Sequence, residues 1–232
     1  MKNEEFRSHP LNQKEKAYGS VWLLFEALFF SAFLHLLNSL LPTPLPQTAL
    51  NFVFFAVNFT VVAFLFREYL WKQIRLVPEV IGKVLMIAVI GFVAYWVVNF
   101  LLAQILLSLD PDFTSINDAN IQQLAAEDYT LMFVGAVLLA PVAEECLFRG
   151  LVFRGMYERK PWLAWVLSIT LFALVHILSY IGAYPIQTLL LCFVQYIPAG
   201  IVLAASYHLS GSLLAPILIH AVVNYIGMLS LR

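Results

Sequence analysis

Seven long apolar runs constrain this chain more than any other feature of its sequence. Each has close to the roughly 20 residues that an α-helix needs to cross the hydrocarbon core of a bilayer. Hydrophobic residues make up 62% of the chain and charged residues only 12%, whereas a soluble domain has about 25% charged residues. We therefore predict an all-α, polytopic integral membrane bundle of about seven transmembrane helices, within a range of six to eight. The runs lie near residues 20–41, 48–66, 84–109, 130–153, 162–180, 186–206 and 212–230.

The positions of lysine and arginine predict how this bundle is oriented. If seven helices alternate across the membrane, twelve of the thirteen basic residues fall on one side. Because cytoplasmic loops are enriched in lysine and arginine, this bias predicts a cytoplasmic N-terminus. The basic residues on that side are Lys2, Arg7, Lys14, Lys16, Arg67, Lys72, Arg75, Lys83, Arg149, Arg154, Arg159 and Lys160.

The same analysis divides the chain into three parts. Residues 1–19 are predicted to form a cytoplasmic N-terminal tail, and residues 20–129 the first transmembrane helices with an acidic extracytoplasmic loop at 110–129. We expect this loop to be solvated; the alternative is a surface that recruits a cationic peptide. Residues 130–232 are predicted to form a helical core. Cys146 and Cys192 lie in apolar runs and are expected to be buried, with no disulfide and no metal pair.

Two adjacent carboxylates and an arginine interrupt the fourth apolar run. Ionisable groups at such a depth are costly, usually face the interior of the bundle and mark function. Residues four apart share a helix face, so Glu145 and Arg149 are predicted to form a structural carboxylate–guanidinium pair. Glu144 points about 100° away from Glu145 and is predicted to face a polar site.

Three further polar residues lie deep in later runs and are candidates for the same site. From the helix rise, Glu144, His220 and His176 lie about 15, 12 and 21 Å from the cytoplasmic ends of their runs. His220 and Asn224 are four residues apart and therefore point the same way. The sequence thus predicts that three helices converge on one polar site between the cytoplasmic interface and the midplane.

These side-chain types are sufficient for hydrolysis of an amide by activated water. A carboxylate beside a histidine can deprotonate a water held between them, and an asparagine amide and a histidine N–H can donate hydrogen bonds to an oxyanion. Alternatively, Glu144, His176 and His220 could bind zinc, because three N and O ligands with one open position are typical of catalytic zinc. The His-Glu-x-x-His motif of soluble zinc proteases is absent. No cofactor is firmly implied, and zinc stays open.

The three motifs together resemble the signature motifs of the CPBP family. They read Glu144-Glu145-x-x-x-Arg149, Phe172-x-x-x-His176 and His220-x-x-x-Asn224. The family contains CAAX prenyl endopeptidases of the Rce1 type and bacterial Abi-like relatives, and the resemblance covers roughly residues 130–230. It implies an intramembrane endopeptidase in which Glu144 and His176 activate the water while His220 and Asn224 form the oxyanion site. The family is often labelled metalloprotease, although a metal-free glutamate mechanism is the leading interpretation.

The leading functional hypothesis is therefore an intramembrane protease in a bacterial plasma membrane. It would cut a membrane-associated peptide or protein tail, in peptide processing or bacteriocin immunity, and a prenylated CAAX substrate is not expected. The second hypothesis is a non-catalytic immunity or scaffold protein that binds a peptide or a receptor, and the third is a transporter. The expected partners are a peptide or membrane-protein substrate and the lipid bilayer, with no nucleic acid; the oligomeric state is not predicted.

Overall fold

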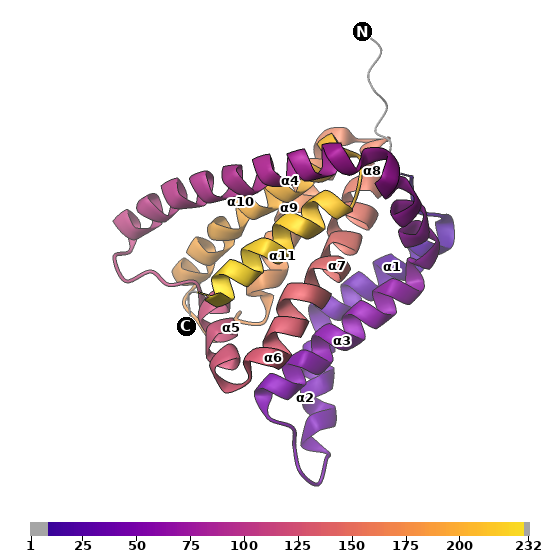
Figure 1. Cartoon of the computed structure of the whole chain (residues 1–232). Coiled ribbons are helices and arrows are strands. Elements are labelled where there is room, and N and C mark those ends of the chain that lie inside the picture. Colours follow the sequence, from indigo (N-terminus) through magenta and orange to yellow (C-terminus); the bar gives the residue numbers. More distant parts are fainter. Residues whose placement is uncertain (1–8, 230–232) are drawn as a thin grey trace.

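The computed structural model describes residues 9–229, and this range contains helices and no strand (Figure 1). Six continuous helical segments are long and apolar enough to cross a membrane, and a seventh apolar helix has 16 residues. The predicted all-α, multi-pass membrane bundle is confirmed. In chain order, with η for a π-helical segment, the elements are α1 (Gln13–Phe25), η1 (Glu26–Phe30), α2 (Ser31–Ser39), α3 (Gln47–Leu65), α4 (Arg67–Leu109), α5 (Ile116–Glu127), α6 (Tyr129–Met132), η2 (Phe133–Leu139), α7 (Ala140–Glu145), η3 (Cys146–Phe153), α8 (Arg154–Tyr157), α9 (Pro161–Leu178), α10 (Ile186–Ser210) and α11 (Leu214–Leu229).

Helix α1 begins at Gln13, inside the stretch 1–19 that is predicted to be a cytoplasmic tail, and the tail itself stays a prediction. Asn12 and Glu15 form a reciprocal capping box that satisfies free N–H groups at the start of the helix. Glu15 also accepts a hydrogen bond from the backbone N–H of Tyr69, 2.8 Å away, and so joins the start of α1 to the start of α4. The first eight residues of the predicted tail lie outside the described residues.

The predicted basic loop before the third span is also helical. α4 is a single helix of 43 residues, whereas the apolar run suggested a span from residue 84. Its first turns bury one side, with Tyr69, Gln73, Leu76 and Val80 spaced three or four residues apart. The Gln73 side chain accepts a hydrogen bond of 2.9 Å from the backbone N–H of Leu213, at the turn between α10 and α11. The sequence signal for this helix is the spacing of its buried residues. It was missed because exposed basic residues lie between them.

The acidic 110–129 segment is not a solvated loop. It contains α5, which buries Ile116, Leu124 and Ala125 against the bundle. The Thr48 hydroxyl of α3 donates a hydrogen bond to the Glu127 carboxylate at the end of α5. The prediction failed because the acidic residues drew attention away from the apolar ones, which fall on one face once the segment is helical.

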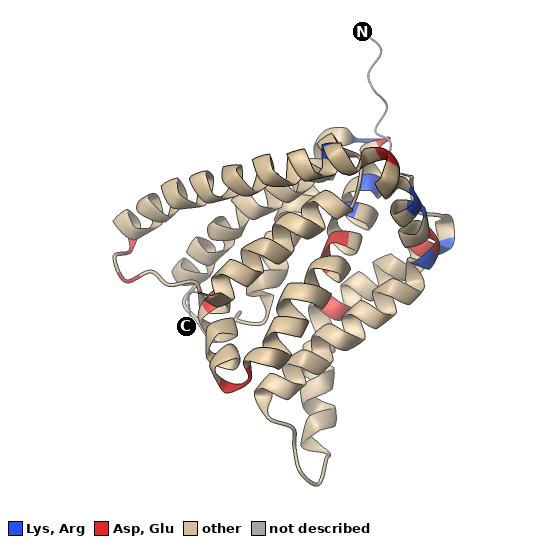
Figure 2. Cartoon of the chain, viewed as in Figure 1, with Lys and Arg blue, Asp and Glu red and all other residues tan. Residues whose placement is uncertain are grey.

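Charge is distributed unevenly over the bundle (Figure 2). The described lysines and arginines gather at the end of the molecule that holds α8 and the starts of α1 and α4, while acidic residues alone occupy the opposite end near α5. This arrangement is the one that the positive-inside rule requires, and the cytoplasmic N-terminus stays a prediction.

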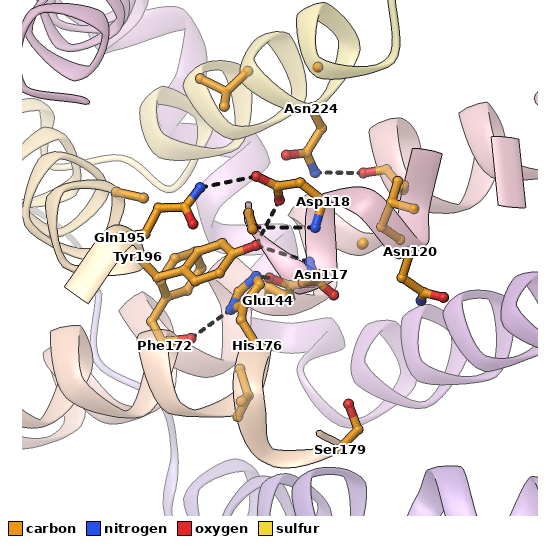
Figure 3. A pocket seen from close by; sticks show the side chains of 18 of the residues that line it. Asn117, Asp118, Asn120, Glu144, Phe172, His176, Ser179, Gln195, Tyr196 and Asn224 are labelled. Carbon is orange, nitrogen blue, oxygen red and sulfur yellow. Dashed lines mark hydrogen bonds and ion pairs between the residues drawn. The ribbon is translucent and has the colours of Figure 1, made fainter. Parts of the chain in front are cut away.

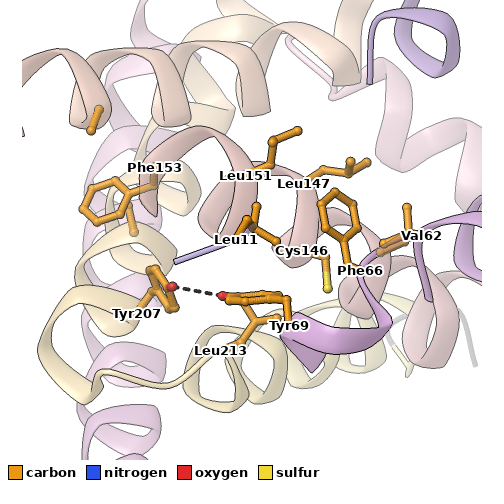
Figure 4. Packing of buried hydrophobic residues seen from close by; sticks show 13 residues of the cluster. Leu11, Val62, Phe66, Tyr69, Cys146, Leu147, Leu151, Phe153, Tyr207 and Leu213 are labelled. Carbon is orange, nitrogen blue, oxygen red and sulfur yellow. Dashed lines mark hydrogen bonds between the residues drawn. The ribbon is translucent and has the colours of Figure 1, made fainter. Parts of the chain in front are cut away.

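A buried cluster holds the helices together at the basic end (Figure 4). Phe66 and Tyr69 of the α3–α4 corner pack there against Leu147 of η3 and Tyr207 of α10. The Tyr69 and Tyr207 hydroxyls lie 2.9 Å apart and form a hydrogen bond. Cys146 belongs to this cluster, and both cysteines are buried and free, as predicted.

One close helix contact supports a stability prediction. A Cβ built on Gly200 of α10 would lie 3.1 Å from the Ile169 Cα and 3.3 Å from the Ile169 carbonyl oxygen in α9. Backbone atoms cannot turn away as a side chain can, so Gly200→Ala is expected to lower the free energy of unfolding by about 1–3 kcal/mol. The measurement is thermal unfolding in detergent. The matched control is Gly155→Ala in α8, where a Cβ meets nothing within 4 Å and no loss of stability is expected.

Candidate active site

The two adjacent carboxylates lie in the centre of a continuous helix from Tyr129 to Tyr157. They end α7, which is flanked by the π-helical segments η2 and η3. Pro141 at the start of α7 has no N–H to donate, and its ring crowds the carbonyl of the preceding turn. The wider helix in η2 accommodates that crowding, and such π-helical turns are frequent at functional sites.

Glu145 is fully buried in a network that reaches three other helices. Its Oε1 accepts hydrogen bonds from Arg149 Nη1 at 3.1 Å and from His220 Nδ1 at 2.9 Å. The Arg149 guanidinium is also fully buried; it donates to the Gly200 carbonyl at 3.3 Å and lies 4.5 Å above the ring of Phe172. Glu145 therefore holds His220 as well as Arg149, and only the second of these contacts was predicted from spacing.

The Glu144 side chain faces two histidines, one of which, His220, also belongs to the Glu145 network. Its Oε2 lies 3.9 Å from His176 Nε2 and 3.9 Å from His220 Nε2. Those distances are too long for direct hydrogen bonds. The same Oε2 is buried and has no hydrogen-bond partner among residues 9–229.

The hydrogen bonds of the two imidazoles define which nitrogen carries the proton. His176 Nδ1 lies 2.7 Å from the Phe172 carbonyl oxygen, and His220 Nδ1 lies 2.9 Å from the Glu145 carboxylate. Both partners can only accept, so both Nδ1 atoms donate. In the neutral rings the Nε2 atoms that face Glu144 therefore present lone pairs.

Tyr196 of α10 joins His176 to α5 (Figure 3). Its ring stacks on the His176 imidazole, with centroids 4.2 Å apart and planes inclined by 23°. Its hydroxyl donates to Asp118 at 2.7 Å and accepts from the Asn117 amide at 3.1 Å. The helix that was mistaken for a loop thus contacts the site through one aromatic side chain.

These groups line a cavity of about 1340 Å³ that also receives Asn224. The Asn224 amide donates to the Ala136 carbonyl of η2 at 2.8 Å, which leaves its second N–H for another acceptor. Glu144, His176, His220 and Asn224 all line the cavity, so the structure brings the four candidate site residues together, and it leaves Glu145 and Arg149 behind them.

The second half of α4 forms one wall of this cavity. Residues of that half at helical spacing, Tyr95, Asn99 and Ala103, line it. Another face of the same helix exposes large apolar side chains at the same spacing, namely Val93, Val97, Leu101 and Ile105. In a membrane bundle such a face contacts lipid. At this wall, therefore, a single helix separates the cavity from the lipid.

The candidate zinc ligands do not form a metal site in this arrangement. Carboxylate oxygen and neutral imidazole nitrogen have the right chemistry for zinc. However, no group of three or more His, Cys, Asp and Glu side chains within residues 9–229 is placed to hold a metal ion.

Sequence reasoning missed several residues that line the cavity. Glu26 of η1 was visible as a lone carboxylate in the first apolar run, which is a signal of function at membrane depth. Asp118 and Asn117 were assigned to a loop, and only recognition of α5 would have placed them. Tyr196 carries no local signal, because an aromatic residue in an apolar run is ordinary.

Fold and site together define a class: a multi-pass helical membrane protein with a carboxylate–histidine site enclosed between its helices. Residues 126–226 match the family model described as type II CAAX prenyl endopeptidase Rce1-like. This part of the chain belongs to the Rce1-like family, which confirms the resemblance to CPBP proteins. The Rce1-like family is one of CAAX-type intramembrane proteases, and at that level the match over residues 126–226 supports a protease.

Two bacterial proteins are similar to this chain over more than half of its length. An Escherichia coli protein described as "Uncharacterized 24.3 kDa protein" is 28% identical over 185 residues, which cover 77% of this chain and 81% of that protein. The UPF0177 protein YbdI of Lactococcus lactis subsp. lactis (strain IL1403) is 26% identical over 142 residues, covering 58% of this chain and 70% of the relative. No solved structure gives a significant match.

Proposed function

We propose that this protein is an intramembrane endopeptidase that hydrolyses a peptide bond in a membrane-associated peptide or protein tail. The observation that carries the proposal is the buried Oε2 of Glu144, which has no hydrogen-bond partner among the described residues and faces two imidazole nitrogens at 3.9 Å. The two bacterial relatives support a bacterial plasma membrane as its location. A role in peptide processing or bacteriocin immunity belongs to the same proposal, and a prenylated substrate does not.

The reaction would begin with a water held between Glu144 and His176. Glu144 takes a proton from this water while the water oxygen forms a bond to the carbonyl carbon of the peptide. The carbonyl oxygen becomes an oxyanion that Asn224 and His220 stabilise. When the C–N bond breaks, the proton on Glu144 moves to the leaving amine, and the other product is a carboxylic acid.

His220 can serve the oxyanion only in its protonated form. Its Nδ1 hydrogen is already donated to Glu145. For Nε2 to donate as well, the ring must carry a second proton, and the ionised Glu145 at 2.9 Å stabilises that imidazolium. Glu145 is therefore proposed as the residue that positions His220 and supports its charge, with Arg149 holding Glu145.

The Asn224 amide is expected to contribute mainly to kcat and little to substrate binding. Asn224→Ala should lower kcat about 10²–10³-fold with little change in KM, because an oxyanion donor acts in the transition state rather than on the bound substrate. The measurement is steady-state kinetics on a cleaved peptide. Asn99→Ala is the matched control: Asn99 lines the same cavity, but its amide donates to the Tyr95 carbonyl in its own helix. A large rise in KM alone would contradict the oxyanion role.

Chelation tests the zinc alternative. Because the described side chains form no group placed to hold a metal, treatment of the purified protein with a strong chelator is expected to leave peptide cleavage unchanged. Elemental analysis of the same preparation gives a second readout that does not depend on activity. Loss of cleavage on chelation, restored by added Zn²⁺, would favour Glu144, His176 and His220 as ligands.

The proposed function itself is tested with the purified full-length chain in detergent and a library of quenched fluorescent peptides. Cleavage of library members by the wild type is the expected result. A wild type that binds peptides and cuts none would support the non-catalytic immunity or scaffold hypothesis. Movement of an ion or solute across vesicles that contain the protein would support the transporter hypothesis.

A further inference from the structure

Glu26 of η1 brings one more carboxylate to the proposed active-site cavity. Among residues 9–229 it accepts one hydrogen bond, from the amide of Asn58 in α3 at a long 3.5 Å. Asn58 is buried and is oriented by the Trp22 indole, which donates to its side-chain oxygen at 2.8 Å. No ion pair reaches Glu26 from any residue between 9 and 229. Glu26 is therefore a positioned carboxylate without a counter-charge.

Apart from histidines, the ionisable side chains that line the cavity are acidic or tyrosine. The described residues that line it include Glu26, Asp118 and Glu144, and they include no lysine or arginine. Asp118 already accepts hydrogen bonds from Tyr196 at 2.7 Å and from Gln195 at 3.2 Å. Glu144 lines the same cavity and is the proposed base. Glu26 alone thus has neither a strong partner nor an assigned role.

The acidic lining would favour cationic groups on a substrate over anionic ones. An anionic group, such as a free C-terminal carboxylate near the scissile bond, would meet carboxylates and no lysine or arginine among the described lining residues. The one buried guanidinium nearby, that of Arg149, is fully enclosed and engaged with Glu145. A cationic side chain would meet Glu26, and opposite charges stabilise each other strongly where water is scarce.

We propose that the cavity selects peptides with a lysine or arginine side chain close to the scissile bond, and that Glu26 is the residue that binds this charge. The inference rests on the proposed function, since it names the substrate class of the same site. It makes Glu26 a specificity-determining residue, distinct from the four residues proposed to carry the chemistry.

The test uses three peptide libraries that differ only at one fixed position, which holds lysine, norleucine or glutamate. The fixed position is moved through the sites on both sides of the library centre, and a neutral maltoside detergent keeps the micelle from attracting cationic peptides. For the wild type, kcat/KM is expected to be about 10-fold or more higher for the best lysine library than for its norleucine match, and lowest for glutamate.

Variants of Glu26 separate this charge effect from a structural one. Glu26→Gln is expected to bring the lysine-to-norleucine ratio close to one, Glu26→Asp to restore part of it, and Glu26→Lys to reverse the preference toward glutamate. Glu79→Gln, an exposed residue outside the cavity, should keep the wild-type ratio.

The outcomes distinguish this inference from the proposed function. Equal cleavage of the three libraries by the wild type would overturn the inference and leave the protease intact. A lysine preference that persists in Glu26→Gln would overturn the role of Glu26. If the wild type cuts none of the libraries, the proposed function fails, and the substrate class fails with it.

Discussion

Replacing Glu144 by glutamine is expected to reduce peptide cleavage about 10³-fold or more. The substitution keeps the size of the side chain but removes the carboxylate that would take the proton from water, a contribution of about 10²–10⁴-fold in general-base catalysis. Fold and substrate binding should survive, because Glu144 Oε2 makes no hydrogen bond within residues 9–229 that the substitution would break. The measurement is kcat/KM on a cleaved library peptide, with peptide binding followed in parallel.

The control for this variant is Glu79→Gln, which makes the same carboxylate-to-amide change at an exposed position on α4. It should cleave at the wild-type rate. If Glu144→Gln kept activity within a few-fold of wild type, Glu144 could not be the base of the proposed mechanism. A variant that loses both cleavage and its cooperative unfolding transition would show that Glu144 acts on the fold, which the proposal does not allow.

Replacing Arg149 by methionine is expected to have the largest effect on stability. The guanidinium is fully buried and donates to Glu145 and to the Gly200 carbonyl. Its removal leaves the Glu145 carboxylate buried in the bundle, with His220 as its one donor among residues 9–229. Breaking one side of a buried ion pair typically costs about 3–5 kcal/mol, and we expect a loss of that size in the free energy of unfolding. Thermal or chemical unfolding in detergent measures it.

Two comparisons isolate the buried pair. Glu158→Gln removes the exposed partner of the Arg154–Glu158 pair and is expected to cost less than about 1 kcal/mol. Glu145→Gln combined with Arg149→Met should cost less than the sum of the single changes, because neither buried charge is then left alone. Strict additivity of the two changes would mean that the pair does not act as a unit.

The transmembrane helices and the motif residues could be predicted because their causes are local. A bilayer fixes the length of an apolar run, so the spans were visible in the sequence, and the cost of charge in lipid makes Glu144, Glu145 and Arg149 conspicuous. The contact between Glu145 and Arg149 follows from helix spacing. The contact between Glu145 and His220 does not, because it joins residues that are 75 positions apart.

The features that were missed lie where local causes are weak. The start of α4 and the whole of α5 are helices of mixed polarity whose buried faces are decided by their neighbours. Tyr196 and Glu26 gain meaning only once α5, α10 and η1 are known to surround the same cavity. Predicted secondary structure alone could not show that these side chains would lie around the same cavity.

The single-helix wall formed by the second half of α4 changes how a substrate is concentrated at this site. A peptide anchored in the lipid beside Val97 and Leu101 is separated from the cavity by about one helix diameter, roughly 10 Å. Confinement to the bilayer raises its effective concentration in the same way as a short tether raises that of a linked ligand. Weak recognition at Glu26 would then be sufficient, because the membrane supplies the proximity that a soluble protease must obtain from contacts with its substrate.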